Sequence, residues 1–195
     1  MTRAVGEPII RTRRWTRREY DRLIELGVLH EDEPIELLAG RLVVREPQRT
    51  PHAVATQLAA EALRAAFGAG WMVRVQLPLA LDDESEPEPD VAVVRGAPRD
   101  YLRDHPSAPA LVVEVAHASL RADRLLKAHL YARAGIAEYW IVNLIDRVLE
   151  VHRLPTGPRS GRRAEYADVR RIALSEFVAP LAAPSATIAV TDLLP

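Results

Sequence analysis

The run Leu111-Val112-Val113-Glu114-Val115 predicts a strand buried on both faces, because four of its five residues are apolar and turn-type residues flank it. The one polar member, Glu114, is a carboxylate inside an apolar strand, which is costly to bury unless it is paired or binds a cation. The run therefore indicates both the centre of the fold and a place where chemistry is expected.

Apolar runs and helical spacings on either side of this strand complete the expected core. The apolar positions that recur at helical spacing are Val54, Leu58 and Ala62 in a helix over residues 51–67, and Ala122, Leu126, Leu130 and Ala134 in a helix over residues 120–134. The other predicted elements are a helix over residues 17–26, a hairpin of residues 34–38 and 41–44, and strands over residues 72–77, 91–94, 139–142 and 148–151.

The order of these elements is that of an α/β or α+β domain, with a central mixed β-sheet flanked by helices. A chain of 195 residues that is 48% hydrophobic has the size of a single domain, residues 1–195. We expect its core over about residues 34–153, and a proline-rich, loosely structured C-terminal extension over about residues 154–195. Apolar residues of the extension are expected to cover a core edge or a partner: Leu174, Phe177, Val178, Leu181 and Ile188.

The composition excludes several classes of protein. Without cysteine, disulfide scaffolds and cysteine-based catalysis are ruled out. A net charge of -1 argues against non-specific coating of nucleic acid. No stretch approaches the ~18 apolar residues of a membrane span, and P-loop and dinucleotide-binding motifs are missing, so we expect neither membrane association nor a nucleotide cofactor. The first 22 residues lack the apolar region of a secretory signal, which predicts a cytoplasmic protein.

Two acidic residues lie where neighbouring strands would bring them together. Asp90 opens the strand over residues 91–94, and Glu114 lies inside the buried strand. If these strands pair, both carboxylates converge on one divalent cation, with the backbone carbonyl of Val115 as a third oxygen ligand.

The 26 basic residues comprise 25 arginines and a single lysine, Lys127. A helix that follows a strand in a crossover runs back along it. Glu114 lies roughly 6–7 Å before the end of its strand, and Lys127 lies roughly 9 Å into the following helix. Because these levels match, the ammonium group is expected near the cation, where it stabilises negative charge on a phosphate or orients an attacking water.

Plainer interpretations exist for both residues. A buried ion pair with an arginine is an alternative explanation of Glu114. Lys127 and Asp123 have the i,i+4 spacing of a helix-surface pair, worth only about 0.3–0.5 kcal/mol. A chain that uses arginine at 25 positions does not need lysine for a surface pair, whereas arginine cannot imitate a compact ammonium group.

Second-rank candidates for the same pocket are Glu36 in the hairpin, His52 at the start of its helix, and Asp123. Glu36 and His52 are expected to act as a further metal ligand or as a proton acceptor. Glu114 and His117 have the Glu-x-x-His spacing of di-metal sites, but in a strand their side chains point to opposite faces, so this interpretation is set aside.

A family resemblance rests on the order of short motifs along residues 14–153. The motifs are Glu36-Leu37-Leu38-Ala39-Gly40-Arg41, His52, Glu88-Pro89-Asp90-Val91, Val113-Glu114-Val115, Ser119, Asp123, Lys127, Tyr131-Ala132, and Gly135 to Glu138-Tyr139-Trp140. Jointly they resemble the bacterial Uma-type restriction endonucleases, a branch of the PD-(D/E)XK nuclease superfamily.

The resemblance implies a restriction-endonuclease-like fold and a phosphodiesterase site that uses Mg²⁺, with Mn²⁺ as a substitute. It implies that Asp90 and Glu114 are metal ligands. The superfamily's lysine normally lies two residues after the second acid, where this chain has Ala116, so Lys127 would take its place. His117 and Asn143 also depart from the branch's usual residues.

The leading hypothesis is therefore a Mg²⁺-dependent endonuclease acting on nucleic acid, with DNA as the expected substrate. A rival is a catalytically silent nuclease fold that serves as an interaction or regulatory protein, and a homodimer is expected. A third hypothesis is a metal hydrolase acting on another phosphate or ester. Expected nucleic-acid contacts are Arg13, Arg14, Arg17, Arg159, Arg162 and Arg163.

Overall fold

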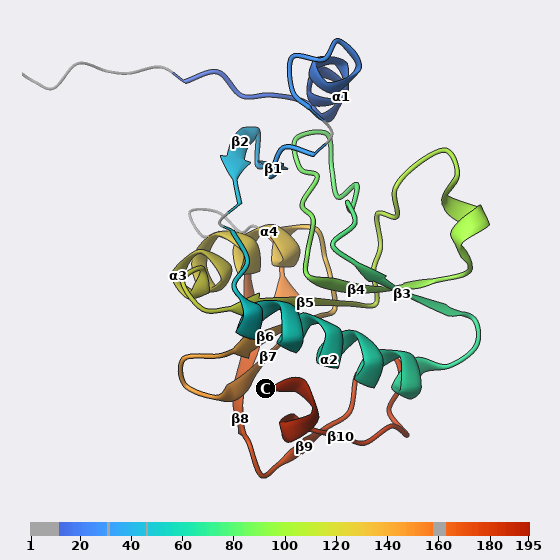
Figure 1. Cartoon of the computed structure of the whole chain (residues 1–195), viewed down its shortest axis with the longest axis vertical. Helices are drawn as coiled ribbons and strands as arrows, with labels where there is room; N and C mark the ends of the chain where they lie inside the picture. The colour runs from blue at the N-terminus through green and yellow to red at the C-terminus, as the bar shows by residue number, and fades with distance from the viewer. Residues whose placement is uncertain (1–11, 31, 46, 158–162) are drawn as a thin grey trace, which may run out of the picture.

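The computed structural model describes residues 12–30, 32–45, 47–157 and 163–195. A six-stranded mixed sheet forms its centre (Figure 1). In the order β3-β4-β5-β6-β7-β8, the strands are β3 (Trp71–Val75), β4 (Val91–Arg95), β5 (Leu111–Ala116), β6 (Glu138–Asn143), β7 (Val148–Thr156) and β8 (Glu165–Ala173). Only β5 and β6 pair in parallel, because the helical segment between them crosses over. The α+β class and the mixed sheet are as the sequence predicted.

Helices cover both faces of this sheet. The long helix α2 (Thr50–Phe67) packs with valines of β4 and β5, and α4 (Ala128–Arg133) packs on the opposite face against the alternate residues of the same strands. All six residues of β5 are buried, as expected for a strand covered on both sides. None of the helices in these described stretches is long and apolar enough to cross a membrane.

A smaller unit of helix and hairpin sits at one end of the sheet (Figure 1). Helix α1 (Arg17–Glu25) begins with a capping box formed by Thr16 and Glu19. The hairpin of β1 (Ile35–Leu38) and β2 (Arg41–Val44) forms a separate two-stranded sheet. Backbone hydrogen bonds with residues 83–86 attach both elements to the rest of the domain. This attachment places the buried Glu36 of β1 near β5.

The C-terminal residues are more ordered than the sequence suggested. The boundary expected at residue 153 falls inside β7, and β8 continues the central sheet, so the expectation of a loose tail is wrong. It was missed because β8 is an edge strand in which six of nine residues are exposed and four are charged. The last elements are β9 (Phe177–Val178), β10 (Ile188–Ala189) and a 3-10 helix (Val190–Leu193). Val178 and Ile188 do cover the core, whereas Phe177 and Leu181 are exposed.

The helices also differ from prediction in which face they bury. In α2 the core-facing residues are Ala55, Ala59, Ala60, Leu63 and Phe67, while Val54 faces solvent. The error arose because α2 is rich in alanine around its whole circumference, so spacing alone did not distinguish two apolar stripes. The helix expected over residues 120–134 is divided into α3 (Leu120–Ala122), a π-helical turn (Asp123–Lys127) and α4, and Ala122 is exposed.

Truncating Leu193 tests whether the C-terminal residues belong to the core. Leu193 is 1% exposed and packs in the same cluster as α2. We expect Leu193→Ala to lower the free energy of unfolding by about 2–5 kcal/mol, because it removes buried methyl groups and leaves a cavity. Urea denaturation measures this, with the exposed Leu181→Ala as control. Equal stability of the two variants would contradict the expectation.

Candidate active site

Asp90 and Glu114 lie side by side at one end of the central strands. Strands β4 and β5 are antiparallel neighbours with Val91 opposite Val113, so the residue before β4 stands next to Glu114. Both carboxylates are buried, Asp90 to 7% exposure and Glu114 to 3%. The pairing of strands on which the predicted site depended is therefore present.

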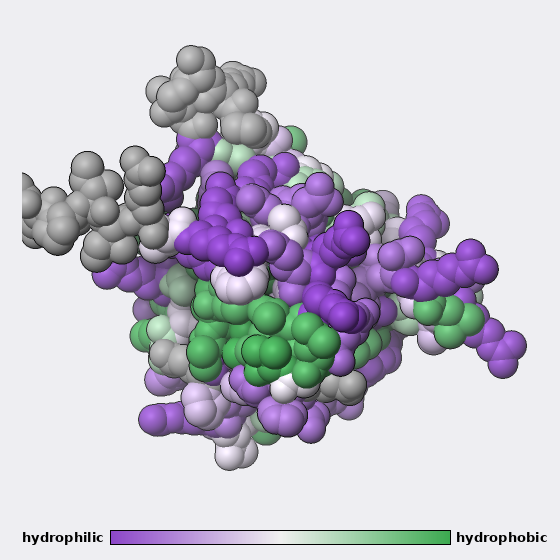
Figure 2. All heavy atoms as spheres, turned by 90° about the horizontal axis from the view of Figure 1, so that it is seen from above, coloured by the Kyte–Doolittle hydropathy of each residue, from purple (hydrophilic) through white to green (hydrophobic). Residues whose placement is uncertain are grey.

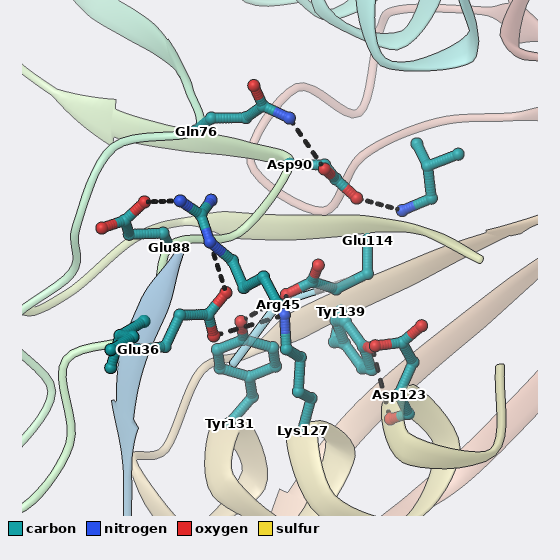
Figure 3. A network of polar contacts seen from close by, with 12 residues as sticks. Glu36, Arg45, Gln76, Glu88, Asp90, Glu114, Asp123, Lys127, Tyr131 and Tyr139 are labelled. Carbon is teal, nitrogen blue, oxygen red and sulfur yellow. Dashed lines mark hydrogen bonds and ion pairs between the residues drawn. The ribbon is translucent and has the colours of Figure 1, made fainter. Parts of the chain in front are cut away.

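Lys127 reaches Glu114 from the crossover helix. Its Nζ donates a 2.9 Å hydrogen bond to Glu114 Oε1, and it lies 3.6 Å from Glu36 Oε2 (Figure 3). The hydroxyl of Tyr131, one helical turn later, donates a 2.7 Å hydrogen bond to the same Glu114 oxygen. Among the described residues, Glu114 is thus paired with no arginine, and Lys127 does not form a surface pair with Asp123. The prediction that Glu114 and Lys127 lie side by side, made from the rise per residue of a strand and of a helix, is therefore confirmed.

The π-helical turn brings Asp123 inward as well. The Ala128 N–H donates to the carbonyl of Asp123, five residues back, and Tyr139 donates its hydroxyl to the same carbonyl at 3.3 Å. Such wide turns are frequent at functional sites. Asp123 is buried, and its Oδ2 makes no hydrogen bond.

One ammonium group contacts two buried carboxylates, Glu114 and Glu36, and a third, Asp123, lies near enough to affect its pKa. Burial and the neighbouring acids raise the pKa of Glu114 to about 8, although Lys127 opposes the shift. Burial also raises the pKa values of Glu36 and Asp123, against the same opposing charge. Burial alone lowers the pKa of Lys127, but Glu114, Glu36 and Asp123 together raise it above its usual value. The lysine therefore stays charged, and the surrounding carboxyl groups compete for its single positive charge.

Asp90 is held differently from the other acids. Its Oδ2 accepts a 2.8 Å hydrogen bond from the Val115 N–H and lies 3.2 Å from Nε2 of His52, while Oδ1 accepts from Gln76 at 3.2 Å. Burial raises the pKa of Asp90, but the bonds from His52 and Val115 outweigh it and lower the pKa overall. Burial lowers the pKa of His52, yet Asp90 and the Val115 backbone raise it overall. Asp90 is consequently the carboxylate most firmly kept in its charged form.

The chemistry of this set of residues fits a divalent cation. Both oxygens of Glu36 and Oδ2 of Asp123 are buried and have no hydrogen-bond partner among the described residues. These oxygens could therefore interact with an additional cation. Within the described residues, no three His, Asp or Glu side chains are grouped to hold a metal by themselves. Mg²⁺ is suited to such a site, because it commonly binds one or two carboxylates and keeps several waters. Asp90, Glu114 and the Val115 carbonyl are the residues that would hold it.

Arginines neutralise the acidic run that precedes Asp90. The pairs are Arg133 with Asp82, Arg14 with Glu84, Arg17 with Glu86, and Arg45 with Glu88. Three arginines expected to contact nucleic acid are therefore engaged within the chain, since Arg13 pairs with Glu19. Of the others, Arg163 is exposed, and Arg159 and Arg162 lie outside the described residues.

The sequence analysis did not predict that three further residues, Tyr131, Gln76 and Arg45, contact the acidic residues of the site. Tyr131 had a usable signal, because it lies four residues after Lys127 on the same helix face. Gln76 and Arg45 had none, since each follows a strand end and reaches the site only through the path of its loop. His117 is exposed, and Asn143 Oδ1 accepts hydrogen bonds from the N–H groups of Ile145 and Asp146 in the turn before β7. Neither of these departures from the family pattern has a hydrogen bond to Asp90 or Glu114 among the described residues.

The mixed sheet, its crossover helix and the acidic pocket define a restriction-endonuclease-like domain. The chain belongs to the Uma2 family, described as "Putative restriction endonuclease", which matches residues 17–189. A similar solved structure is a putative nuclease belonging to DUF820 from Anabaena variabilis, with a TM-score of 0.61 and 16% identity over 88% of this chain and 96% of that one. Among curated protein sequences, none matches this chain.

The raised pKa of Glu114 predicts a specific dependence of stability on pH. Its ordinary value is 4.5 and its folded value is about 8, so between these values the folded protein keeps a proton that the unfolded chain has lost. The contribution of Glu114 to the free energy of unfolding must then fall as the pH rises from about 5 to 8. We expect Glu114→Gln to gain stability relative to wild type over this interval, in urea titrations with EDTA. A difference that is constant with pH would contradict the shift.

Proposed function

We propose that this protein is a Mg²⁺-dependent endonuclease that hydrolyses phosphodiester bonds of nucleic acid, with DNA as the substrate. The observation that carries the proposal is the buried contact of Lys127 with Glu114, next to Asp90 on the adjacent strand. Family membership supports the nuclease class. Family membership does not identify the cation, its ligands or the substrate, and these are our proposals.

Each residue of the pocket has a role in this proposal. A Mg²⁺ ion bound by Asp90, Glu114 and the Val115 carbonyl would supply Lewis-acid polarisation of the phosphate and a more acidic bound water. Lys127 keeps Glu114 oriented and offers its ammonium charge to the phosphate oxygens as negative charge develops. His52 and Gln76 fix the two oxygens of Asp90. Tyr131 holds the same Glu114 Oε1 from one turn further along the same helix face.

The proposal includes a homodimer. Figure 2 looks down on the end of the molecule that carries α1 and the hairpin, and it shows a hydrophobic patch there. Exposed apolar side chains at this end include Leu26, Val28 and Val44. Such a patch is typical of a surface that associates. It also supports the rival, non-catalytic function as an interaction protein. The cytoplasmic location stays a prediction from the sequence.

Removing the three central groups is expected to abolish cleavage. Asp90→Ala, Glu114→Ala and Lys127→Ala should each lower the rate of Mg²⁺-dependent cleavage by about a hundredfold or more, because each removes a cation ligand or the neighbouring positive charge. The assay is cleavage of plasmid, single-stranded DNA and RNA with Mg²⁺ or Mn²⁺. Glu61→Gln, on the exposed side of α2, is the control and should cut like wild type.

The same assay separates the rival functions. Wild-type protein that binds partners but cuts no nucleic acid with either ion would favour the silent interaction protein. Cleavage of other phosphate or ester substrates alone would favour the third hypothesis. Equal activity of wild type and all three variants would show that the pocket is not the site of cleavage.

A further inference from the structure

The acidic residues of the candidate site would repel the phosphate backbone of a nucleic acid. Glu36, Glu88, Asp90, Glu114 and Asp123 are acids in or beside it. Lys127 already contacts Glu114 and Glu36 and its side chain is only 14% exposed, so this one ammonium group offsets few of these negative charges. A phosphate group of the substrate that this protein is proposed to cut therefore needs a second basic group that reaches solvent.

Arg45 is placed where that group is needed. It follows β2, and its guanidinium lies between two acids, with Nη2 2.9 Å from Glu88 Oε2 and Nε 3.7 Å from Glu36 Oε1 (Figure 3). Glu36 therefore has Lys127 on one oxygen and Arg45 on the other. The side chain of Arg45 is 31% exposed, twice the fraction of Lys127, and its buried Nε makes no hydrogen bond.

We propose that Arg45 binds a backbone phosphate of the nucleic acid beside the acidic residues that surround Lys127. The inference rests on the proposed function for its substrate class. A guanidinium group has five donors in a planar fork and binds phosphate oxygens in pairs, so it can hold Glu88 and a phosphate at once. Glu36 and Glu88 orient it before substrate arrives, which reduces the ordering required on binding. Arg13, Arg14 and Arg17 have no contact with Glu36 among the described residues.

Binding measured without cleavage tests this role. A fluorescently labelled duplex DNA is titrated with protein in Ca²⁺ in place of Mg²⁺, at several salt concentrations. Arg45→Gln is expected to weaken binding by about tenfold or more, since a charged hydrogen-bonded contact is lost. It should also reduce the slope of log affinity against log salt by about one. Arg45→Lys, which keeps the charge but not the fork, should retain the slope and recover part of the affinity.

Arg133→Gln is the matched control. Arg133 pairs with Asp82 of the same acidic run and is 27% exposed, close to the value for Arg45, but it has no contact with Glu36 or Glu88 in the described residues. It should bind duplex like wild type. Thermal melting of each variant checks that the fold is intact, and Arg45→Lys carries the test if Arg45→Gln does not fold.

The outcomes distinguish this inference from the proposed function. If wild type binds and cuts DNA while Arg45→Gln binds with unchanged affinity and salt slope, the role of Arg45 is overturned and the nuclease proposal stands. If Arg133→Gln loses as much affinity as Arg45→Gln, the effect is one of general charge and the inference fails. If wild type neither binds nor cuts nucleic acid, both proposals fall.

Discussion

The buried ammonium group of Lys127 is the interaction on which the arrangement of this pocket depends. It joins Glu36 of the hairpin to Glu114 of the central strand, and it extends from a helix that itself packs on the sheet. Removing one partner of such a buried pair leaves an uncompensated charge, which is strongly destabilising. The contact therefore fixes the position of the hairpin unit relative to β5 as well as the orientation of the Glu114 carboxylate.

Charge is balanced differently inside and outside the pocket. Away from Lys127, arginines pair singly with partly exposed acids of residues 82–88, as with Asp82 and Glu84. Their long, forked side chains reach across from other elements, which suits partly exposed pairs. Inside, one compact ammonium faces three acids, so the balance is left incomplete. This contrast accounts for a lysine rather than an arginine at position 127, and the proposed cation would add positive charge to the site.

Sequence reasoning found the centre of the molecule better than its margins. Glu114, Asp90 and Lys127 could be located because strand and helix rises fix where residues lie along adjacent elements. Arg45 could not, because its approach depends on how a separate hairpin attaches to the body through residues 83–86. The strand β8 was missed because one face of an edge strand needs few apolar residues, and the buried stripe of α2 was misassigned because alanine surrounds that helix.

The central claim is that Asp90 and Glu114 share a divalent cation beside Lys127. Anomalous diffraction from crystals grown with Mn²⁺ tests it most directly, because manganese can be located independently of any activity. The account predicts an anomalous peak within about 2.5 Å of a carboxylate oxygen of each acid, a distance typical of oxygen ligands to such ions. No peak at this position at saturating Mn²⁺, or a peak bound only by other residues, would contradict it.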